Sequence, residues 1–308
     1  MPEKLRIACI GEAMIELSSH ADATDMAKVA YAGDTLNTAV YLKRALNQRN
    51  IEAEVHYVTR VGQDRFSEQM LGMMREEHLQ TELIEKDSHR LPGIYAISTD
   101  ELGERRFSYW RNESAARLLF QPRVSEALAA LNEFQGIYWS AITLAILPAN
   151  VRNELLHWLA DYRRQPGRWV AFDSNYRPAL WEDQSTAENA INNAWQQCDI
   201  ALPSIDDEIA LFDDESESDL IQRFKSYGIT RGALKRGRTG PTNLFCDNPA
   251  TRLRSLDSVV DSTAAGDSFN GAYLAALISG CDEQTALIAG HDCAIKVISH
   301  PGAIIPKF

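Results

Sequence analysis

The stretch Val259-Val260-Asp261-Ser262-Thr263-Ala264-Ala265-Gly266-Asp267-Ser268-Phe269 runs from an apolar, strand-like pair through small residues directly into a predicted helix. After it, apolar side chains recur at helical spacing at Tyr273, Ala276 and Leu277, and Gly280 is the predicted C-terminal cap. A strand that leads through a short turn into a helix is typical of α/β proteins. This stretch therefore predicts both the fold class and a place for chemistry.

The residues from Ala264 to Asp267 fall at the N-terminus of that helix. There the first N–H groups have no intrahelical acceptor, and the aligned peptide dipoles attract a phosphate or a developing oxyanion. Alanine and glycine let such an anion come close to the backbone. Asp267 has two interpretations: an ordinary acid that stabilises the helix dipole, or a general base. Spacing alone does not choose between them.

Predicted strands and helices alternate along most of the remaining chain. We predict strands at residues 7–10, 14–17, 55–61, 137–142, 169–172, 200–202 and 233–235, and helices that begin near residues 36 and 64 and at 148–164, 187–197, 206–212 and 220–227. The amphipathic helix after residue 64 carries Phe66, Met70, Met73 and Met74, and we interpret its methionines as core filler. Residues 18–28 form a polar interruption. Such alternation predicts a mainly parallel α/β sheet with helices on both faces.

Residues 93–99 and 106–111 break this alternation. They are two strand-like runs around a turn at residues 100–103, which predicts a β-hairpin in a small sheet appended to the main one. Tyr95, Tyr109 and Arg111 lie on its two arms. An arginine beside aromatic rings suits the carboxylate of a small substrate, and ordinary cross-strand packing is the competing interpretation.

Polar residues follow two of the predicted parallel strands, where open α/β sheets bind ligands. Asp173-Ser174-Asn175-Tyr176-Arg177-Pro178 follows one strand, and the proline keeps Arg177 out of helical geometry, so that it could present its guanidinium to an anion. Lys235-Arg236-Gly237-Arg238-Thr239-Gly240 follows another and combines cations with glycines that admit a phosphate. A solvated surface loop is the alternative interpretation of both segments.

Two further positions have open interpretations. One is the segment Gly33-Asp34-Thr35-Leu36-Asn37 at the start of a predicted helix. These residues either cap the helix or form a cluster that binds hydroxyl groups. Capping leaves Asn37 unexplained. His291 lies in the helical segment Ala289-Gly290-His291, where a histidine is by itself an ordinary core or surface residue.

Composition narrows the function class. The net charge of −12 disfavours a nonspecific nucleic-acid or anionic-membrane surface. Five scattered cysteines without a C-x-x-C pair fit a reduced, cytoplasmic protein, and the apolar run at residues 7–10 is too short for a signal peptide or a membrane span. The seven histidines lack H-E-x-x-H spacing, so no structural zinc is expected. A Rossmann dehydrogenase is disfavoured because no G-x-G-x-x-G follows the first strand.

Taken together, these stretches resemble the PfkB (ribokinase-like) carbohydrate kinases over essentially the whole chain, and more closely the 2-keto-3-deoxygluconate kinases. Residues 261–269 are similar to the family signature D-T-x-G/A-A-G-D-x-F, with Ser262 in place of the usual threonine. The remaining matches are Gly33 with Asn37, Gly62-x-Asp64-x-Phe66, and the subgroup segments at residues 32–37, 90–93, 109–113, 175–178 and 302–306.

The resemblance implies a three-layer α/β/α fold with a mainly parallel central sheet. It implies a single domain over residues 1–308, with a small β-sheet lid contributed by about residues 12–34 and 91–112. ATP, Mg²⁺ and a keto-deoxy sugar acid are the implied ligands. Asp267 would accept the proton of the C6 hydroxyl of 2-keto-3-deoxy-D-gluconate, while the N–H groups of Ala264, Ala265 and Gly266 stabilise the transferred charge.

The resemblance also implies two sets of binding residues. The substrate set is Gly33, Asp34, Asn37, Tyr95, Tyr109, Arg111, Arg177 and Asp267. The nucleotide set is Asn175, Arg177, Lys235, Gly237, Gly240, Ala264, Gly266 and His291. The metal ligand stays open, because Ser204-Ile205-Asp206-Asp207-Glu208 stands where many relatives carry N-x-x-E.

Lids in this family often pair, so a homo-oligomer is expected. The alternatives are a kinase for another sugar, such as fructose or 2-keto-3-deoxygalactonate, and a non-catalytic sugar- or nucleotide-binding protein of the same fold. Asp267 after two small residues and a glycine argues against the non-catalytic protein.

Overall fold

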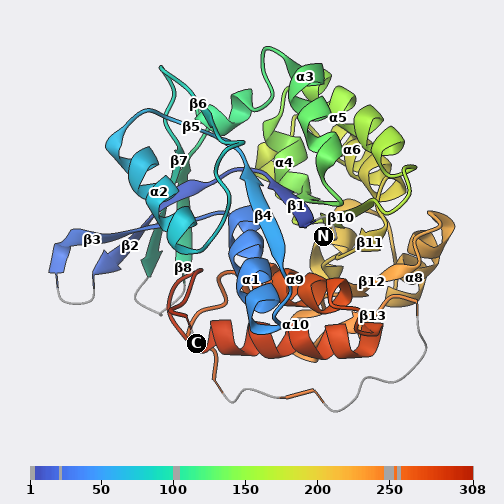
Figure 1. The fold of residues 1–308 in the computed structure, drawn as a ribbon. Helices are drawn as coiled ribbons and strands as arrows, with labels where there is room; N and C mark the ends of the chain where they lie inside the picture. The colour runs from blue at the N-terminus through green and yellow to red at the C-terminus, as the bar shows by residue number, and fades with distance from the viewer. Residues whose placement is uncertain (1–3, 21–22, 100–104, 246–252, 255–257, 308) are drawn as a thin grey trace.

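The computed structural model describes residues 4–20, 23–99, 105–245, 253–254 and 258–307. Its centre is a seven-stranded sheet of order β13-β12-β11-β10-β9-β1-β4 (Figure 1). The strands are β1 (Leu5–Ile10), β4 (Ala53–Val58), β9 (Gly136–Ser140), β10 (Trp169–Asp173), β11 (Ile200–Ala201), β12 (Arg231–Leu234) and β13 (Thr242–Asn243). From β4 to β12 all neighbours pair in parallel, and only β13 pairs antiparallel with its neighbour β12. The predicted parallel α/β sheet is confirmed.

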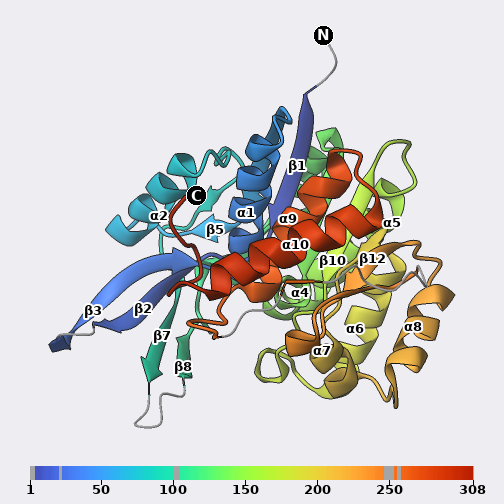
Figure 2. The ribbon, with the colours of Figure 1, turned by 90° about the horizontal axis from the view of Figure 1, so that it is seen from below.

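Helices cover both faces of this sheet. They are α1 (Asp34–Gln48), α2 (Arg65–Glu76), α3 (Val124–Ala129), α4 (Ala141–Ile146), α5 (Ala149–Tyr162), α6 (Gln184–Gln196), α7 (Ile205–Leu211), α8 (Glu217–Ser226), α9 (Ala265–Ile278) and α10 (Glu283–Ile298). Because side chains alternate along a strand, Ala8 and Ile10 join the core with α3 to α6, whereas Ile7 and Cys9 join the core with α1, α9 and α10. The result is the expected three-layer α/β/α arrangement, with α9 and α10 in front in Figure 2.

A separate four-stranded sheet lies beside the main one. It consists of β2 (Met14–His20), β3 (Ala23–Ala32), β7 (Gly93–Thr99) and β8 (Arg105–Trp110) in the order β3-β2-β7-β8. β7 and β8 are antiparallel, which confirms the predicted hairpin, while its turn at residues 100–103 lies outside the described residues. Figure 1 shows this sheet projecting to one side of the molecule. We call it the lid.

Several predicted boundaries were wrong. Residues 18–28 were predicted as a polar interruption, yet β2 continues to His20 and β3 begins at Ala23. Their composition misled because β3 is an edge strand, and the described side chains of Met26, Ala27, Lys28 and Val29 are exposed. An edge strand with an open face needs no apolar alternation.

Other corrections concern single boundaries. Val259 and Val260 form no strand: their exposed fractions are 48% and 54%, and the Val260 N–H donates to the Ile298 carbonyl at the end of α10 (2.9 Å). The strand predicted at 55–61 is interrupted at Thr59, where β4 gives way to the short strand β5 (Arg60–Val61), which pairs with β6 (Glu85–Lys86).

Two more residues depart from the prediction. The strand predicted at residues 137–142 ends at Ser140, because its last residues begin helix α4. Phe66, predicted among the apolar residues of the amphipathic helix, has an exposed fraction of 45%; it lies in the first turn of α2 beside the N-cap Asp64, which accepts its N–H at 2.9 Å. Among the described residues, no helix combines the length and apolarity needed to cross a membrane.

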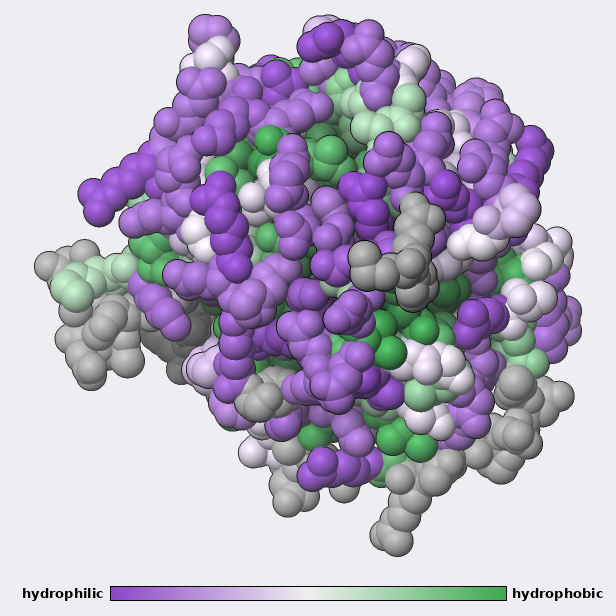
Figure 3. Space-filling view, in the orientation of Figure 1, coloured by the Kyte–Doolittle hydropathy of each residue, from purple (hydrophilic) through white to green (hydrophobic). Residues whose placement is uncertain are grey.

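The surface drawn in Figure 3 is mainly hydrophilic, and its hydrophobic residues lie in small separate groups. One such group is at the left edge, over β2 and β3 of the lid. Exposed large apolar residues of the lid include Met26, Val29, Phe107 and Trp110. The face drawn in Figure 3 therefore presents mainly polar groups to water, and the lid carries several exposed apolar side chains.

Candidate active site

A cavity of about 680 Å³ lies where the carboxyl edge of the main sheet, the lid and helices α9 and α10 meet. Its wall draws on elements that are far apart in sequence: Gly33 precedes α1, Tyr95 and Arg111 come from the lid hairpin, Asn175 follows β10 and Asp267 lies on α9. The volume is in the range of small-molecule sites. This cavity is the candidate active site.

Asp267 lies in the first turn of α9, facing the start of α1. The Asn37 side-chain amide donates to Asp267 Oδ2 at 2.8 Å, and the Thr38 hydroxyl donates to the Asp267 carbonyl at 3.2 Å. The two helices approach this closely because residue 271 is glycine: a Cβ there would stand 2.6 Å from the Leu42 backbone nitrogen. Asn37, which capping left unexplained, therefore orients the carboxylate of Asp267.

The surroundings of Asp267 favour its neutral form. Burial raises the pKa of this carboxyl to about 8, and the nearby carboxylates of Asp34 and Asp173 add to the effect, while the Asn37 amide and the Lys235 ammonium oppose it. Such a pKa makes the carboxylate a much stronger proton acceptor than an ordinary aspartate. Dipole stabilisation alone would require no such environment, so the geometry favours the general-base interpretation.

The start of α9 is shaped as an anion site. Ala264 is the N-cap and adopts a left-handed conformation (φ 59°, ψ 18°), which is unusual for a residue other than glycine. Ala264, Ala265 and Gly266 all line the cavity. The Ala265 N–H already donates to the Ser262 carbonyl at 3.2 Å, so its share in binding a new anion is smaller than the resemblance implies.

A cation lies beside this helix N-terminus. Lys235, which directly follows β12, places its Nζ 2.8 Å from Asp173 Oδ2 and 3.6 Å from the point where a Cβ on Gly266 would stand. Asp173 is buried at the end of β10 and also accepts from the Asn270 amide at 2.6 Å. Positive charge thus meets the positive end of the α9 dipole, an arrangement that suits a phosphate between them.

A buried ion pair lies at the base of the lid, between residues that flank β2 and β8. Arg111 Nη2 pairs with Glu12, and the two residues have exposed fractions of 8% and 1%. Tyr95 donates its hydroxyl to Glu16, and burial with that acidic neighbour raises the pKa of the Tyr95 hydroxyl. Tyr109 is 53% exposed, and its ring centroid lies 6.0 Å from that of Tyr95. Charged and aromatic groups therefore face the cavity from the lid.

The structure separates the three acids at the start of α7. Asp206 and Asp207 line the cavity, whereas Glu208 is buried away from it and pairs with Arg223 at 2.8 Å. Asp207 is held by Arg177 Nη1 at 3.3 Å, and burial raises the pKa of its carboxyl. Of the three, only Asp206 and Asp207 can contact a metal ion carried by a ligand in the cavity.

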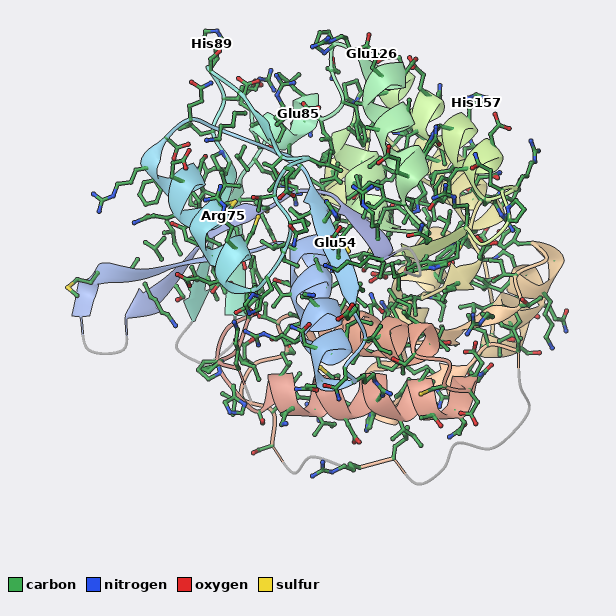
Figure 4. The ribbon with its side chains drawn as sticks, viewed as in Figure 1. Glu54, Arg75, Glu85, His89, Glu126 and His157 are labelled. Carbon is green, nitrogen blue, oxygen red and sulfur yellow. The ribbon has the colours of Figure 1, made fainter. Side chains whose placement is uncertain are left out.

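Among the residues that the structure describes, the other acids and histidines add no metal site. Within the described ranges, no group of three or more His, Cys, Asp or Glu side chains is arranged to hold a metal ion. His89 and His157 point outward into solvent in Figure 4. His291 instead lines the cavity, and its Nε2 lies 2.8 Å from the Arg254 carbonyl.

The sequence profile of the pfkB family carbohydrate kinases matches residues 4–307. The chain belongs to this family. It is 40% identical to the 2-dehydro-3-deoxygluconokinase of Escherichia coli K12 over 308 residues, which cover 98% of this chain and 97% of that one. The signature at residues 261–269 is thus part of a match that spans nearly the whole pfkB chain.

Solved structures of pfkB-type kinases share the fold. A 2-dehydro-3-deoxygluconokinase from Thermotoga maritima superposes with a TM-score of 0.83 at 19% identity, covering 98% of this chain and 95% of that one. A putative ribokinase II of Escherichia coli in complex with ATP and Mg²⁺ superposes with a TM-score of 0.82 at 18% identity, covering 97% and 94%. At these identities the likeness establishes the ribokinase-like fold alone.

The pfkB fold gathers nearly all the residues singled out from the sequence. Together with Ala265, the residues of both sets that line the cavity are Gly33, Asp34, Asn37, Tyr95, Tyr109, Arg111, Asn175, Arg177, Lys235, Gly237, Ala264, Gly266, Asp267 and His291. Gly240 is the exception: it is buried behind the wall, where an added Cβ would stand 3.9 Å from His291. The loop turns inward there, because the Arg236 side chain donates to the Gly240 carbonyl at 3.0 Å.

Gly33 and Asp34 have distinct structural reasons to be at this wall. Gly33 has φ 153°, and a Cβ there would stand 2.2 Å from the Glu12 carbonyl oxygen, so only glycine fits. Asp34 accepts from the Asn175 amide at 2.8 Å and from the Ser140 hydroxyl. These two hydrogen bonds fix the Asp34 carboxylate, whose negative charge raises the pKa of Asp267.

Two acids of the cavity wall, Glu12 and Asp173, were given no role of their own from the sequence. Glu12 follows the glycine that ends the first strand, and Asp173 closes the β10 strand. Both stand at carboxyl ends of parallel strands, which is the rule that located Asn175 and Arg177. The signal was present, but which acid pairs with Arg111 or Lys235 depends on contacts between distant segments.

Proposed function

We propose that this chain phosphorylates 2-keto-3-deoxy-D-gluconate at the C6 hydroxyl, using ATP and giving 2-keto-3-deoxy-6-phosphogluconate and ADP. The observation that carries the proposal is the Asp267 carboxylate, held by Asn37 at the N-terminus of α9 inside a cavity that also contains Arg111. The 40% identity to the Escherichia coli 2-dehydro-3-deoxygluconokinase over 98% of the chain supports this substrate.

In the proposed reaction Asp267 accepts the proton of the C6 hydroxyl while that oxygen forms a bond to the γ-phosphorus. The bond from this phosphorus to the β–γ bridging oxygen breaks, and ADP leaves. Asn37 Nδ2 holds the Asp267 carboxylate at 2.8 Å, and buried Asn37 Oδ1 has no partner among the described residues. That oxygen is free to accept a second hydroxyl of the sugar acid. The start of α9 stabilises the charge on the transferred group.

The ATP phosphates would lie near the cationic loop after β12. Lys235, Arg236 and Gly237 line the cavity there, next to the start of α9. The ribokinase II structure in complex with ATP and Mg²⁺, which shares the fold, supports this assignment of ligands. Asp206 and Asp207 fit a magnesium ion that arrives with the nucleotide, because Mg²⁺ is commonly bound by one or two carboxylates plus substrate phosphates. The ion would neutralise charge on the phosphate oxygens.

Replacing Asp207 with asparagine tests the magnesium assignment. We expect the Mg²⁺ concentration for half-maximal rate to rise by about tenfold, since a carboxylate ligand or its water-bridged equivalent is lost. The measurement is the initial rate against free Mg²⁺ at fixed ATP. Asp213→Asn is the matched control, because Asp213 is an exposed acid of the following loop that does not line the cavity. An identical Mg²⁺ dependence for Asp207→Asn and the control would refute the assignment.

The pH dependence tests the base. Because burial and neighbouring acids raise the pKa of Asp267 to about 8, the active carboxylate form increases as the pH rises through this value. We expect kcat/KM at limiting concentrations of both substrates to rise with unit slope below about pH 8 and to level off above it. If the acid limb of the profile had a pKa in the ordinary range of carboxyl groups, the raised pKa of Asp267 would be refuted.

A substrate panel tests the function itself. The acid-recognising group, Arg111, favours a keto-deoxy acid over a neutral ketose. A coupled ADP-release assay with 2-keto-3-deoxygluconate, 2-keto-3-deoxygalactonate and fructose should give the highest kcat/KM with the first. Fructose as the best substrate would establish the neutral-sugar alternative. No ADP release with any of them, together with binding of ATP, would favour a non-catalytic binding protein.

We further propose that two copies pair through their lids. The support is the exposed apolar surface of the lid: Met26, Val29 and Trp110 have exposed fractions of 55%, 43% and 61%. Burying such residues against a second copy would remove them from water. Light scattering after size exclusion should give twice the chain mass, and Val29→Lys should shift it toward the monomer. Ile209→Lys, an exposed apolar residue on α7, is the control. A monomer at assay concentrations would refute the pairing.

A further inference from the structure

Lys235 and Asp173 form a contact that the proposed reaction does not yet explain. The two charged atoms lie 2.8 Å apart, with side-chain exposed fractions of 13% and 3%. An ion pair on the surface would contribute little to stability. A desolvated pair interacts more strongly with nearby charges, here with the carboxylate of Asp267. The pair links the ends of β10 and β12, two strands that border β11 on either side.

The position of the Lys235 ammonium is determined from two sides. Asp173 Oδ2 accepts from it and also from Asn270 Nδ2 at 2.6 Å, and Asp173 Oδ1 accepts the Asn175 N–H at 3.2 Å. The Asp173 carboxylate is therefore fixed by α9 and by its own loop. On the other side, Lys235 Nζ lies 3.6 Å from the point of a Cβ on Gly266, next to the N-terminus of α9. A phosphoryl group arriving at that N-terminus would meet the ammonium directly.

We propose that Asp173 holds the Lys235 ammonium beside the start of α9 in the free enzyme, and that Lys235 then binds the phosphoryl group in transfer. Lys235 is the catalytic cation, and Asp173 is its positioning residue. Lys235 keeps its proton throughout, so the proton of the sugar hydroxyl still goes to Asp267. This inference rests on the proposed kinase function and adds to it the source of the positive charge.

The same pair acts on Asp267 with opposite signs. The charged groups around Asp267 are Asp34 from α1, Asp173 from β10 and Lys235 after β12; the carboxylate in turn raises the pKa of the hydroxyls of Tyr41, Tyr95 and Tyr138. The Lys235 ammonium lowers the pKa of Asp267, whereas the Asp173 carboxylate raises it. Removing the Lys235 charge should therefore raise the pKa of Asp267, and removing the Asp173 charge should lower it.

The test uses Lys235→Met, Asp173→Asn and the double variant in the full-length protein. We expect Lys235→Met to lower kcat by about 100- to 1,000-fold, the range for loss of one group that stabilises transition-state charge. Asp173→Asn should lower kcat by about 10- to 100-fold, because a misplaced ammonium still carries its charge. The acid limb of the pH–rate profile should move to higher pH in Lys235→Met and to lower pH in Asp173→Asn.

A second measurement is independent of turnover. The ¹³C shift of the Asp267 carboxyl, titrated in the unliganded protein, should show the same two opposite displacements. In the double variant the midpoint should return toward that of the unmodified protein, while kcat stays as low as in Lys235→Met. The double variant also removes the risk of misfolding from one stranded buried charge. Lys86→Met and Asp161→Asn make the same charge changes on surface pairs and are the controls.

The outcomes separate the two proposals. Absence of kinase activity in the unmodified protein would refute the proposed function, while the carboxyl titration would still report on the pair. If the unmodified protein is active and Lys235→Met keeps near-normal kcat, Lys235 is not the catalytic cation. If both single variants move the Asp267 midpoint in one direction, or match their surface controls, the pair is merely structural.

Discussion

Replacing Asp267 with asparagine should lower kcat by about 10²- to 10⁴-fold, the range for loss of a general base. Asparagine fills the same space and can still accept from the Asn37 amide, so the dissociation constants of ATP and the sugar acid should change little. Single-turnover kinetics and calorimetric titration measure the two quantities separately. A correctly folded Asp267→Asn protein with near-normal turnover would exclude Asp267 as the base.

The same variant should be more stable than the unmodified protein. A carboxyl whose folded-state pKa is raised holds its proton more tightly in the folded chain, so its contribution to stability is present below its ordinary pKa of 3.8 and is lost as the pH rises toward about 8. Asparagine has no such loss. The gain should grow steadily from pH 4 to pH 8. Thermal melts across this range measure it.

Replacing Arg111 with alanine should lower kcat/KM for the sugar acid by about 100- to 1,000-fold and leave ATP binding nearly unchanged. Arg111 is buried at the lid side of the cavity, away from the cationic loop after β12. The measurement is kcat/KM against 2-keto-3-deoxygluconate, with ATP affinity determined by calorimetry. An unchanged kcat/KM would remove Arg111 from the substrate site.

Folding must be controlled in this experiment, because Arg111→Ala leaves Glu12 buried without its partner. Breaking a buried ion pair in this way costs about 3–5 kcal/mol of stability. Combining Arg111→Met with Glu12→Gln removes both charges and conserves most of the volume. We expect this double variant to regain stability without regaining affinity for the acid. Recovery of activity together with stability would mean that Arg111 acts only through folding.

The sequence was sufficient for the fold and for most of the site, for identifiable reasons. Helical spacing after Asp267 and the alternation of strands and helices are local properties, and α9 and the parallel sheet confirm them. Ligands bind at the carboxyl ends of parallel strands, and this rule singled out the segments that contain Asn175 and Lys235. Both residues line the cavity. The family resemblance supplied the role predicted for His291, which spacing did not.

The remaining features depend on contacts between distant segments. The pairs of Glu12 with Arg111 and of Asp173 with Lys235 span 99 and 62 residues, so no local pattern reveals them. The edge strand β3 was missed because an exposed strand carries no apolar period. Asp207 and Glu208 are adjacent in sequence, yet only one lines the cavity, since successive residues of a helix point about 100° apart.

The close contact of α1 and α9 at Gly271 divides the catalytic machinery into a fixed part and an adjustable part. Asn37 and Asp267 are carried by two helices whose backbones touch, so their relative geometry does not depend on what the lid does. Tyr95, in contrast, lies on β7 of the lid, and Arg111 directly follows β8. A movement of the lid would therefore change its contacts with the sugar acid, while the Asp267 carboxylate would stay aligned with Asn37. With the roles proposed for Arg111 and Asp267, substrate selection and proton transfer would be open to separate change in this chain.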